Sequence, residues 1–265
     1  MKPPIPPTAL TIAGSDPSGG AGIQADLKTF HQRGVYGEAV LTLVTVQNTM
    51  CVAAVEVLSP SLVGAQLDAV LGDIPPAAAK TGALGDSAVV ELVARRARSF
   101  AFPLVVDPVM ISKHGAALMT AEARRALGSL LLPEAFLVTP NLAEAAELAG
   151  MPVDDLPSMK EAAARIASLG VEAVLVKGGH LEGDAVDLLL YRGKIALYRA
   201  PRIETRNTHG TGCTFSACIT AELARGRTLA EAVGTAKQFI TRAIETAPGL
   251  GGGAGPVNHH VRVEP

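Results

Sequence analysis

The sequence predicts a single α/β domain, a three-layer α/β/α sandwich around a mostly parallel central sheet. Short apolar runs of strand length alternate with longer segments of helical period, and strands joined by crossover helices form parallel sheets covered on both faces. Hydrophobic residues make up 48% of the chain and 27 glycines punctuate it, which is typical of a packed α/β protein. With 265 residues the chain can bury a large core, so one domain over residues 1–265 is the simplest division.

The first half of the alternation ends near residue 100. In chain order we predict a strand over 9–14, a helix over 20–34, a strand over 39–47, a helix over 59–73, a strand over 77–82 and a helix over 86–100. The strands are short apolar runs, and the helices carry apolar residues at helical spacing. Ser59 followed by Pro60 indicates where the second helix begins, because serine caps helices and proline suits the first helical residue.

The second half continues the same pattern. We predict a strand over 103–110, a helix over 120–132, a strand over 135–141, helices near 141–149 and 158–169, and a strand over 172–179. Residues 184–201 are predicted to form a hairpin that turns at Arg192–Gly193–Lys194, which adds antiparallel strands to the sheet. Residues 249–260 are rich in glycine, and we expect residues 1–7 and about 249–256 to be flexible.

Charge and composition exclude several classes of protein. The 23 Lys and Arg residues against 25 Asp and Glu residues give a net charge of −2 without a basic run, so no nucleic-acid partner is expected. No apolar stretch approaches the roughly 18 residues that span a bilayer, and the proline-rich start does not resemble a signal peptide. We therefore expect a cytoplasmic protein with no membrane partner. The three cysteines form no CxxC pair, which favours free thiols in a reducing compartment.

Polar residues follow most of the predicted strands. In open α/β sheets, ligands bind at the carboxyl ends of the strands, so these positions are the candidates for a site. They are Gly14–Ser15–Asp16, Gln47–Asn48, Lys80–Thr81–Gly82, Asp107–Pro108–Val109–Met110, Thr139–Pro140–Asn141, Lys177–Gly178–Gly179 and Thr208–His209–Gly210–Thr211–Gly212–Cys213. Each could alone be an ordinary turn, but their shared position predicts one site.

Cys213 follows two glycines where a loop turns into a helix that begins near residue 211. Glycines at 210 and 212 let the backbone approach a ligand, and the first turn of a helix presents unpaired amides, which favours an anion site. The known GxxxxGK[ST] phosphate loop does not occur in the chain. A thiol at a helix N-terminus has a pKa below about 8.5, so we expect Cys213 to be partly thiolate and to act as a base or a nucleophile. The alternative is a small core residue, which we expect of Cys218.

Seven segments share their residues and their order with one known family. They are ALTIAGSDPSGGAGIQADLKTF (9–30), VQNT (46–49), KTGALGD (80–86), VVDPVM (105–110), TPNLAEAAEL (139–148), VLVKGGH (174–180) and NTHGTGCTFSA (207–217). Together they resemble the hydroxymethylpyrimidine/phosphomethylpyrimidine kinases of thiamine biosynthesis, which have the ribokinase-like fold. The resemblance extends over nearly the whole chain, to about residue 260.

The resemblance implies an ATP-dependent kinase. It would phosphorylate the hydroxymethyl group of 4-amino-5-hydroxymethyl-2-methylpyrimidine and then convert the monophosphate to the pyrophosphate. Phosphoryl transfer depends mainly on positioning and on charge stabilisation. By resemblance, the amides of Gly210, Thr211, Gly212 and Cys213 form the anion hole. Cys213 takes the place that an aspartate base holds in most ribokinase-like enzymes.

The resemblance also implies a nucleotide and metal site. Asn141 and Glu144 would hold Mg²⁺ through waters, with Asp107 close by, and such a partly hydrated site suits Mg²⁺. Lys177, Asn141 and Thr208 would bind the ATP. The residues themselves allow simpler roles, because Asn141 is also placed to cap a helix and a lysine at a strand end is often solvated.

Gln47 is the candidate for binding the pyrimidine. Its carboxamide offers an acceptor and a donor side by side, which matches a ring nitrogen next to an exocyclic amine. By resemblance Gly14, Ala21, Asp26 and Val109 complete the pocket, although Asp26 could instead be a solvated helix residue. Ala83 stands where many relatives have methionine, which leaves the pocket wall thinner and the selectivity open. His209 is expected only to shape its loop, and His259 and His260 to lie in the tail.

Three alternatives remain open at this stage. Some close relatives with the same cysteine phosphorylate pyridoxal or pyridoxine, so that activity could replace or accompany pyrimidine phosphorylation. Cys213 could be the nucleophile of a hydrolase or acyl transferase, with His209 as its partner. The chain could also be a ligand-binding regulator without turnover. Relatives further suggest a homodimer.

Overall fold

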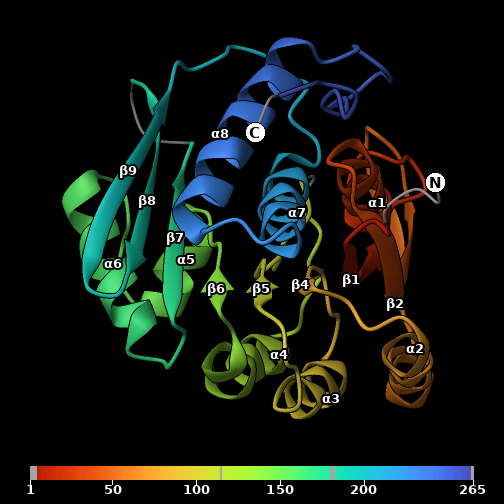
Figure 1. Ribbon diagram of the computed structural model, residues 1–265. Coiled ribbons are helices and arrows are strands. Elements are labelled where there is room, and N and C mark those ends of the chain that lie inside the picture. The colour runs from red at the N-terminus through yellow and green to blue at the C-terminus, as the bar shows by residue number, and fades with distance from the viewer. Residues whose placement is uncertain (1–4, 114, 180–182, 264–265) are drawn as a thin grey trace.

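The structure is a computed structural model that describes residues 5–113, 115–179 and 183–263. Its centre is a nine-stranded sheet in the order β3-β2-β1-β4-β5-β6-β7-β8-β9 (Figure 1). The strands are β1 (Thr8–Ser15), β2 (Tyr36–Gln47), β3 (Val52–Val57), β4 (Ala78–Thr81), β5 (Leu104–Val106), β6 (Leu137–Val138), β7 (Ala173–Gly178), β8 (Ala185–Tyr191) and β9 (Lys194–Ala200). The strands from β2 to β7 in this order pair in parallel, whereas β3, β8 and β9 add antiparallel pairs at the two edges.

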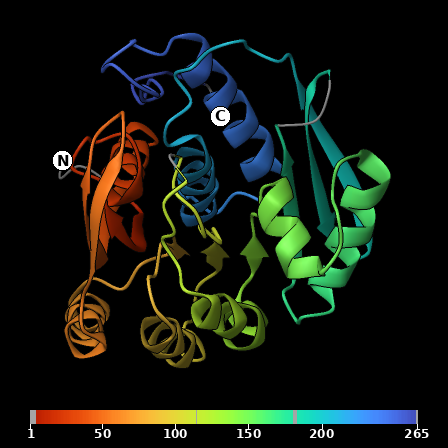
Figure 2. The ribbon, with the colours of Figure 1, turned by 180° about the vertical axis from the view of Figure 1, so that it is seen from behind.

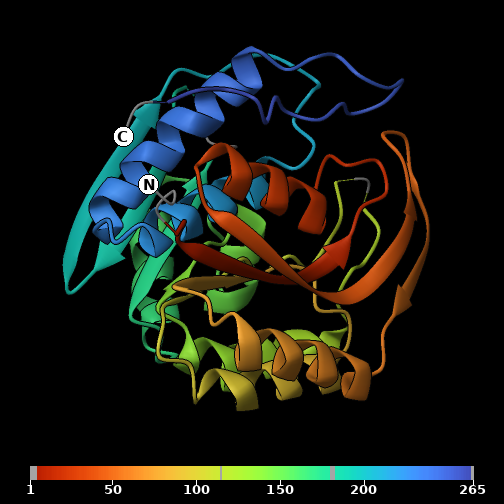
Figure 3. The same ribbon diagram turned by 45° about the vertical axis from the view of Figure 1, so that its right-hand side comes forward.

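Helices cover both faces of this sheet. They are α1 (Gly22–Gln32), α2 (Pro60–Asp73), α3 (Ser87–Ala97), α4 (Ala121–Ala126), α5 (Leu142–Ala149), α6 (Leu156–Ala167), α7 (Thr211–Ala224) and α8 (Leu229–Glu245). Figure 3 shows α1, α7 and α8 on one face and α2 and α3 on the other. The view from behind in Figure 2 brings α5 and α6 in front of the sheet. The predicted three-layer α/β/α sandwich is therefore confirmed.

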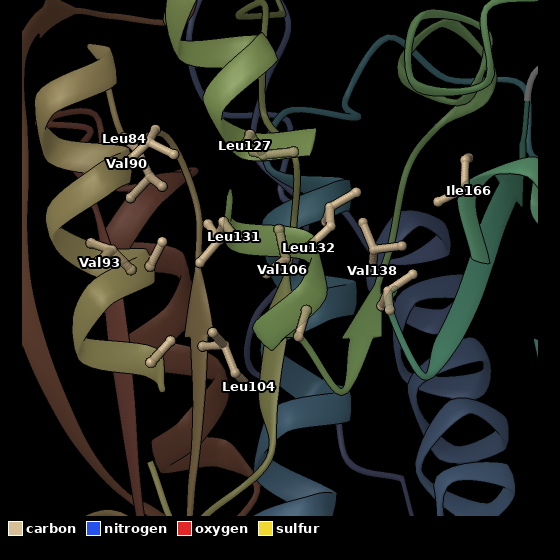
Figure 4. Packing of buried hydrophobic residues seen from close by; sticks show 14 of the residues in the cluster. Leu84, Val90, Val93, Leu104, Val106, Leu127, Leu131, Leu132, Val138 and Ile166 are labelled. Carbon is tan, nitrogen blue, oxygen red and sulfur yellow. The ribbon is translucent and has the colours of Figure 1, made fainter. Parts of the chain in front are cut away.

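Aliphatic side chains fill the space between the layers. On one face, Val90 and Val93 of α3 pack with Leu104 and Val106 of β5, as Figure 4 shows. A second cluster joins α7 and α8 to the opposite face, with Phe239 at its centre. These two clusters anchor the sheet from both sides, so the carboxyl ends of its parallel strands are held at one edge.

Most predicted elements are present close to their predicted bounds. Ser59 caps α2 by accepting a hydrogen bond from the Leu62 amide, with Pro60 as the first helical residue. The hairpin of β8 and β9 turns at Arg192 and Gly193, which have positive φ angles of 49° and 72°, as a tight hairpin turn requires.

Three parts of the sequence prediction differ from the structure. The helix predicted over 120–132 is α4 followed by a wide π turn (Leu127–Leu131) and a short 3-10 turn, because Pro133 cannot continue an α-helix. The strand predicted over 103–110 keeps only the three residues of β5, and the strand predicted over 135–141 keeps only the two residues of β6. The sequence analysis assigned neither β3, which pairs with β2 at the edge, nor α8.

The glycine-rich segment near the C-terminus contacts two loops. The Gly253 amide donates to Oγ1 of Thr49 at 3.3 Å, and the His209 amide donates to the Gly255 carbonyl at 3.0 Å. The flexibility expected for residues 249–256 stays a prediction, as it does for residues 1–7, of which 1–4 lie outside the described residues. No helix among the described residues is long and apolar enough to cross a membrane.

Candidate active site

The turn before α7 packs closely against the first loop of the chain. Gly210 has a φ of 78°, and a Cβ atom there would overlap the carbonyl of Gly20. Only glycine combines that left-handed backbone with so close an approach. Gly210 is also the N-cap of α7, and no side chain caps this helix. In this turn the Thr211 amide donates to the Thr208 carbonyl at 3.3 Å, whereas the amides of Gly212 and Cys213 have no backbone acceptor among the described residues. The anion site expected from the sequence stays a prediction.

A buried ion pair lies beside this turn. Nζ of Lys177 is 2.9 Å from Oδ1 of Asp107, and a Cβ atom built on Gly212 would lie 3.2 Å from the same Nζ. Ser216 of α7 donates to Oδ2 of Asp107 at 3.1 Å. Burial alone would raise the pKa of Asp107, but the ammonium of Lys177 and then that of Lys80 lower it, so the carboxylate is ionised. The alternative of a solvated Lys177 is therefore wrong.

Asn141 and Glu144 form a capping box at the start of α5. The Asn141 amide donates to Oε2 of Glu144 at 2.8 Å, and the Glu144 amide donates to Oδ1 of Asn141 at 2.9 Å. The helix-cap role considered for Asn141 is confirmed. Burial raises the pKa of Glu144 to about 7, the nearby Lys177 ammonium opposes this, and the Asp107 carboxylate adds to it. The backbone of Asn141 also forms a parallel β-bridge with Lys177 on β7, which connects the capping box to the ion pair.

Cys213 is a half-buried residue in the first turn of α7. The depressed pKa expected from the sequence is wrong. Burial, helped by the carboxylates of Asp26 and Asp107, raises the pKa of its thiol to about 12, because the Lys80 ammonium and the Gly22 amide only partly compensate. The thiol is thus the resting form at neutral pH. Cys218 is fully buried in the α7–α8 cluster, as expected for a packing residue.

Asp26 is fully buried rather than solvated, so the simpler alternative for it is wrong. Both of its oxygens lie 2.8 Å from Nζ of Lys80, and Oγ1 of Thr11 donates to Oδ2 at 2.6 Å. Burial alone would lower the pKa of Lys80, but the Asp26 carboxylate raises it, followed by Cys213 and Asp107. The Asp26–Lys80 pair therefore belongs to the electrostatic surroundings of Cys213.

His209 joins three segments at the same edge of the sheet. Its Nε2 is 2.7 Å from Oδ2 of Asp16 and 3.3 Å from Nε2 of Gln47. The His209 and Asp16 side chains are 3% and 4% exposed, so the contact is shielded from water. His209 thus does more than shape its own loop, because it ties the loop after β1 to the end of β2.

The remaining predicted residues lie at the same edge. Ala21 is the N-cap of α1, and its amide donates to Oδ2 of Asp16 at 2.9 Å. The Ala83 carbonyl accepts from Oγ1 of Thr42 at 2.6 Å. The hydrogen bonds found in the described part of the chain do not link Ala83 or Val109 directly to Gln47.

Gly14 and Thr208 are held by their immediate surroundings. A Cβ atom on Gly14 would meet the side chain of Leu43 on β2, which leaves no room for another residue there. The Thr208 carbonyl accepts from the hydroxyl of Thr211 at 2.7 Å, which shapes the turn before α7.

Three residues of the site had no role predicted from the sequence. Asp16 and Lys80 stood in motifs after strands but received no role, although a buried charge at a strand end is itself a signal. His259 was expected in the tail, but it is 5% exposed and its Nε2 lies 3.0 Å from Oγ1 of Thr214 on α7. The distant pairing that buries His259 could not be read from a glycine-rich segment.

Comparison with known proteins supports a kinase site. A family model described as phosphomethylpyrimidine kinase matches residues 16–258. The chain belongs to this family. A hydroxymethylpyrimidine/phosphomethylpyrimidine kinase of Streptomyces coelicolor is 47% identical over 258 residues, which cover 97% of this chain and 96% of that protein. The member described here is thus a phosphotransferase, as the sequence predicted.

Solved structures of two relatives share the fold. A pyridoxal kinase of Bacillus subtilis in complex with ADP aligns with a TM-score of 0.89 at 40% identity, covering 96% of this chain and 98% of that chain. A phosphomethylpyrimidine kinase of Clostridium difficile aligns with a TM-score of 0.80 at 44% identity, covering 90% and 99% of the two chains. The ribokinase-like fold expected from the resemblance is confirmed, and both substrate classes occur among relatives of similar identity.

Proposed function

We propose that this family member transfers the γ-phosphoryl group of ATP to 4-amino-5-hydroxymethyl-2-methylpyrimidine, and then to the resulting monophosphate, in thiamine biosynthesis. One observation carries the proposal: the first turn of α7, which no side chain caps, lies beside the Lys177–Asp107 ion pair. A Cβ atom built on Gly212 in this turn would lie 3.2 Å from Nζ of Lys177. Helix amides and a lysine at one point suit a transferring phosphoryl group.

The first transfer converts an alcohol into a phosphate ester. The hydroxymethyl oxygen bonds to the γ-phosphorus, the bond from that phosphorus to the bridging oxygen breaks, and ADP leaves with the electron pair. We assign the amides of Gly210, Thr211, Gly212 and Cys213 at the start of α7 to the charge that spreads over the phosphoryl oxygens. The Thr211 amide donates to the Thr208 carbonyl at 3.3 Å and would exchange this acceptor for the phosphoryl group. Lys177 and Thr208 contact the ATP phosphates in this arrangement, and the ammonium of Lys177 adds positive charge there.

The hydroxyl proton needs an acceptor, and Cys213 is the proposed base. Because the thiol is protonated at rest, only its thiolate form can accept that proton. Lys80 is the buried cation that stabilises such a thiolate. The thiolate is a strong base when it forms, since its conjugate acid has a pKa of about 12.

The residues present fit a hydrated Mg²⁺ rather than a metal held only by protein. Asp107 already accepts from Lys177, Thr139 and Ser216, so its oxygens are available mainly through water. Glu144 is a buried carboxyl with a pKa of about 7, which a nearby dication would keep ionised. We therefore assign Glu144 and Asp107, with Asn141 beside them, to the waters of a Mg²⁺ that neutralises phosphate charge when bound.

The pyrimidine is proposed to lie between Gln47 and the turn before α7. Gly14, Ala21, Asp26, Ala83 and Val109 line the same edge of the sheet and would close around the ring. Phosphorylation of pyridoxal or pyridoxine is the second candidate, because a pyridoxal kinase is 40% identical to this chain. Family membership argues against the hydrolase and against a regulator without turnover.

Phosphorus NMR of ATP incubated with the pyrimidine alcohol tests the proposal. We expect ADP, a monophosphate ester and then a pyrophosphate. ATP that remains intact with the pyrimidine but is consumed with pyridoxal would show that the second candidate is right. Comparison of kcat/KM for the two alcohols decides which substrate is preferred. Size measurement in solution tests the predicted homodimer, and localisation in cells tests the cytoplasmic assignment.

A further inference from the structure

The Asp16–His209–Gln47 contact determines which nitrogen of His209 carries a proton. Oδ1 of Asp16 accepts from the Ser18 amide, and Oδ2 accepts from the Ala21 amide, both at 2.9 Å. These donors and His209 hold the carboxylate in its ionised form, which can only accept hydrogen bonds. Nε2 of His209, at 2.7 Å from Oδ2, must therefore be the protonated nitrogen.

That proton constrains the carboxamide of Gln47, which lies 3.3 Å from the same Nε2. A protonated Nε2 cannot accept a hydrogen bond from an amide NH₂ group, but it can share its proton with an amide oxygen. The atom of Gln47 placed nearest to His209 is Nε2, but a half turn about the last bond of the carboxamide exchanges it with Oε1. The contact with His209 therefore favours Oε1 of Gln47 on the His209 side.

The opposite end of the carboxamide leads to the same orientation. Oγ1 of Thr45 lies 3.3 Å from the end of Gln47 that faces away from His209. The single proton of that hydroxyl is donated to the Ser15 carbonyl at 2.9 Å. Thr45 can then only accept from Gln47, so the group facing it is the NH₂ group.

We propose that Asp16 and His209 are positioning residues that fix the direction of the Gln47 carboxamide, with Oε1 toward His209 and Nε2 toward Thr45. The inference rests on the proposed function and deepens it. With this direction Oε1 accepts from the pyrimidine amine, and Nε2 donates to the adjacent ring nitrogen.

The direction also decides where the reacting group points. The carbon that bears the hydroxymethyl group neighbours the carbon that bears the amine, so both substituents lie on the Oε1 side. That side is the His209 side, and His209 directly precedes the turn 210–213. A reversed carboxamide would bind the ring turned over, with the hydroxyl directed away from Cys213. The same direction rejects a 4-oxo pyrimidine, whose ring N–H and carbonyl present the opposite pattern.

The test compares kcat/KM for the 4-amino substrate with that for 5-hydroxymethyl-2-methylpyrimidin-4-one in the wild type and two variants. In Asp16→Asn an amide NH₂ can face His209, which lets Nε2 become an acceptor and the carboxamide reverse. In Thr45→Val the NH₂ group of Gln47 loses its acceptor. We expect the preference for the 4-amino substrate to fall at least about tenfold in each variant, mainly through KM.

Matched controls carry the same substitutions away from Gln47. Asp86→Asn changes the cap of α3, where asparagine serves equally well, and Thr29→Val removes a buried hydroxyl that donates to a backbone carbonyl on α1. Both controls should keep the wild-type preference. If Asp16→Asn fails to fold, Thr45→Val alone decides the question.

The possible outcomes test the positioning role and the proposed function separately. A preference within about twofold of wild type in both variants, with the wild type active on the 4-amino substrate, overturns the positioning role and leaves the proposed function intact. A wild type that phosphorylates neither pyrimidine overturns both. A purely structural role for Asp16 would lower kcat/KM for the two substrates by the same factor, which also contradicts the proposal.

Discussion

At the scale of single residues, the proposed role of Cys213 as the base predicts different effects on the two phosphorylation steps. The first step removes a hydroxyl proton, whereas the second uses a phosphate oxygen that is already anionic near neutral pH. We expect Cys213→Ala to slow the first step by about 100-fold or more and the second step much less. Separate assays with the alcohol and with purified monophosphate measure the two effects.

Cys213→Asp is the matched variant for that experiment. A carboxylate at this position can accept the proton, so we expect it to recover part of the first step. Equal losses in both steps for Cys213→Ala, with no recovery in Cys213→Asp, would show that Cys213 is not the base.

The raised pKa of Cys213 also predicts a pH dependence. Below a pKa of about 12, the thiolate fraction grows about tenfold for each pH unit. We therefore expect kcat of the first step to rise between pH 7 and pH 9 while chemistry limits the rate, and kcat of the second step to rise far less. Parallel profiles for the two steps would contradict a thiolate base. The profiles are measured at saturating ATP and pyrimidine.

At the scale of elements, the first turn of α7 is sensitive to a single methyl group. In Gly212→Ala the added Cβ lies 3.2 Å from Nζ of Lys177 and 3.8 Å from Oδ2 of Asp107. This narrows the space proposed for the phosphoryl group, so we expect kcat/KM for ATP to fall at least about tenfold without a loss of folding. Steady-state kinetics and thermal unfolding together measure the two effects.

Gly234→Ala in α8 is the control for that substitution. The nearest atom to the added Cβ is 3.8 Å away, on Tyr198, which is an ordinary contact. Alanine favours a helix interior by about 1 kcal/mol over glycine, so this variant should be active and slightly more stable. Unchanged kinetics in Gly212→Ala would show that the phosphoryl group does not bind at this turn.

The elements also show what the sequence could and could not predict. Strands β1, β2 and β7 were predictable because each is an apolar run between turn residues, and the α2 boundary because Ser59 and Pro60 carry a local signal. The edge strand β3 was missed because five of its six residues are alanine or valine with no clear alternation. The local sequence pattern does not predict an element whose structure depends on pairing with residues distant in the sequence.

The same limit applies to the site. The turn 210–213 was indicated by its motif at a strand end, and the proposed roles of Lys177 and Asp107 came from the family resemblance. The pKa of Cys213 did not, because helix position argued for a lower value, and burial beside two carboxylates reversed it. The pairing of Asp16 with His209 joins residues 193 positions apart, and no local signal connects them.

At the scale of the whole molecule, Glu38 makes stability depend on pH. This residue of β2 is 8% exposed, and its Oε2 has no hydrogen-bond partner within the described residues. Burial raises the pKa of Glu38 from 4.5 to about 7. Between these values the unfolded chain loses the proton before the folded one, so stability falls as pH rises and is constant above about pH 7.

Glu38→Gln removes this dependence. We expect the variant to melt about 7–14 °C above the wild type at pH 8, with the difference vanishing below pH 4.5. Thermal unfolding at several pH values measures it, and Glu56→Gln on the exposed edge strand is the control. A constant difference across that pH range would show that Glu38 is not the titrating group.

The close approach of Gly210 to the carbonyl of Gly20 has a consequence for protein engineering. The backbones of the two loops are in such close contact that neither loop can be redesigned while the other keeps its native backbone. Grafting the turn 210–213 onto another scaffold would therefore require the transfer of residues 16–21 as well.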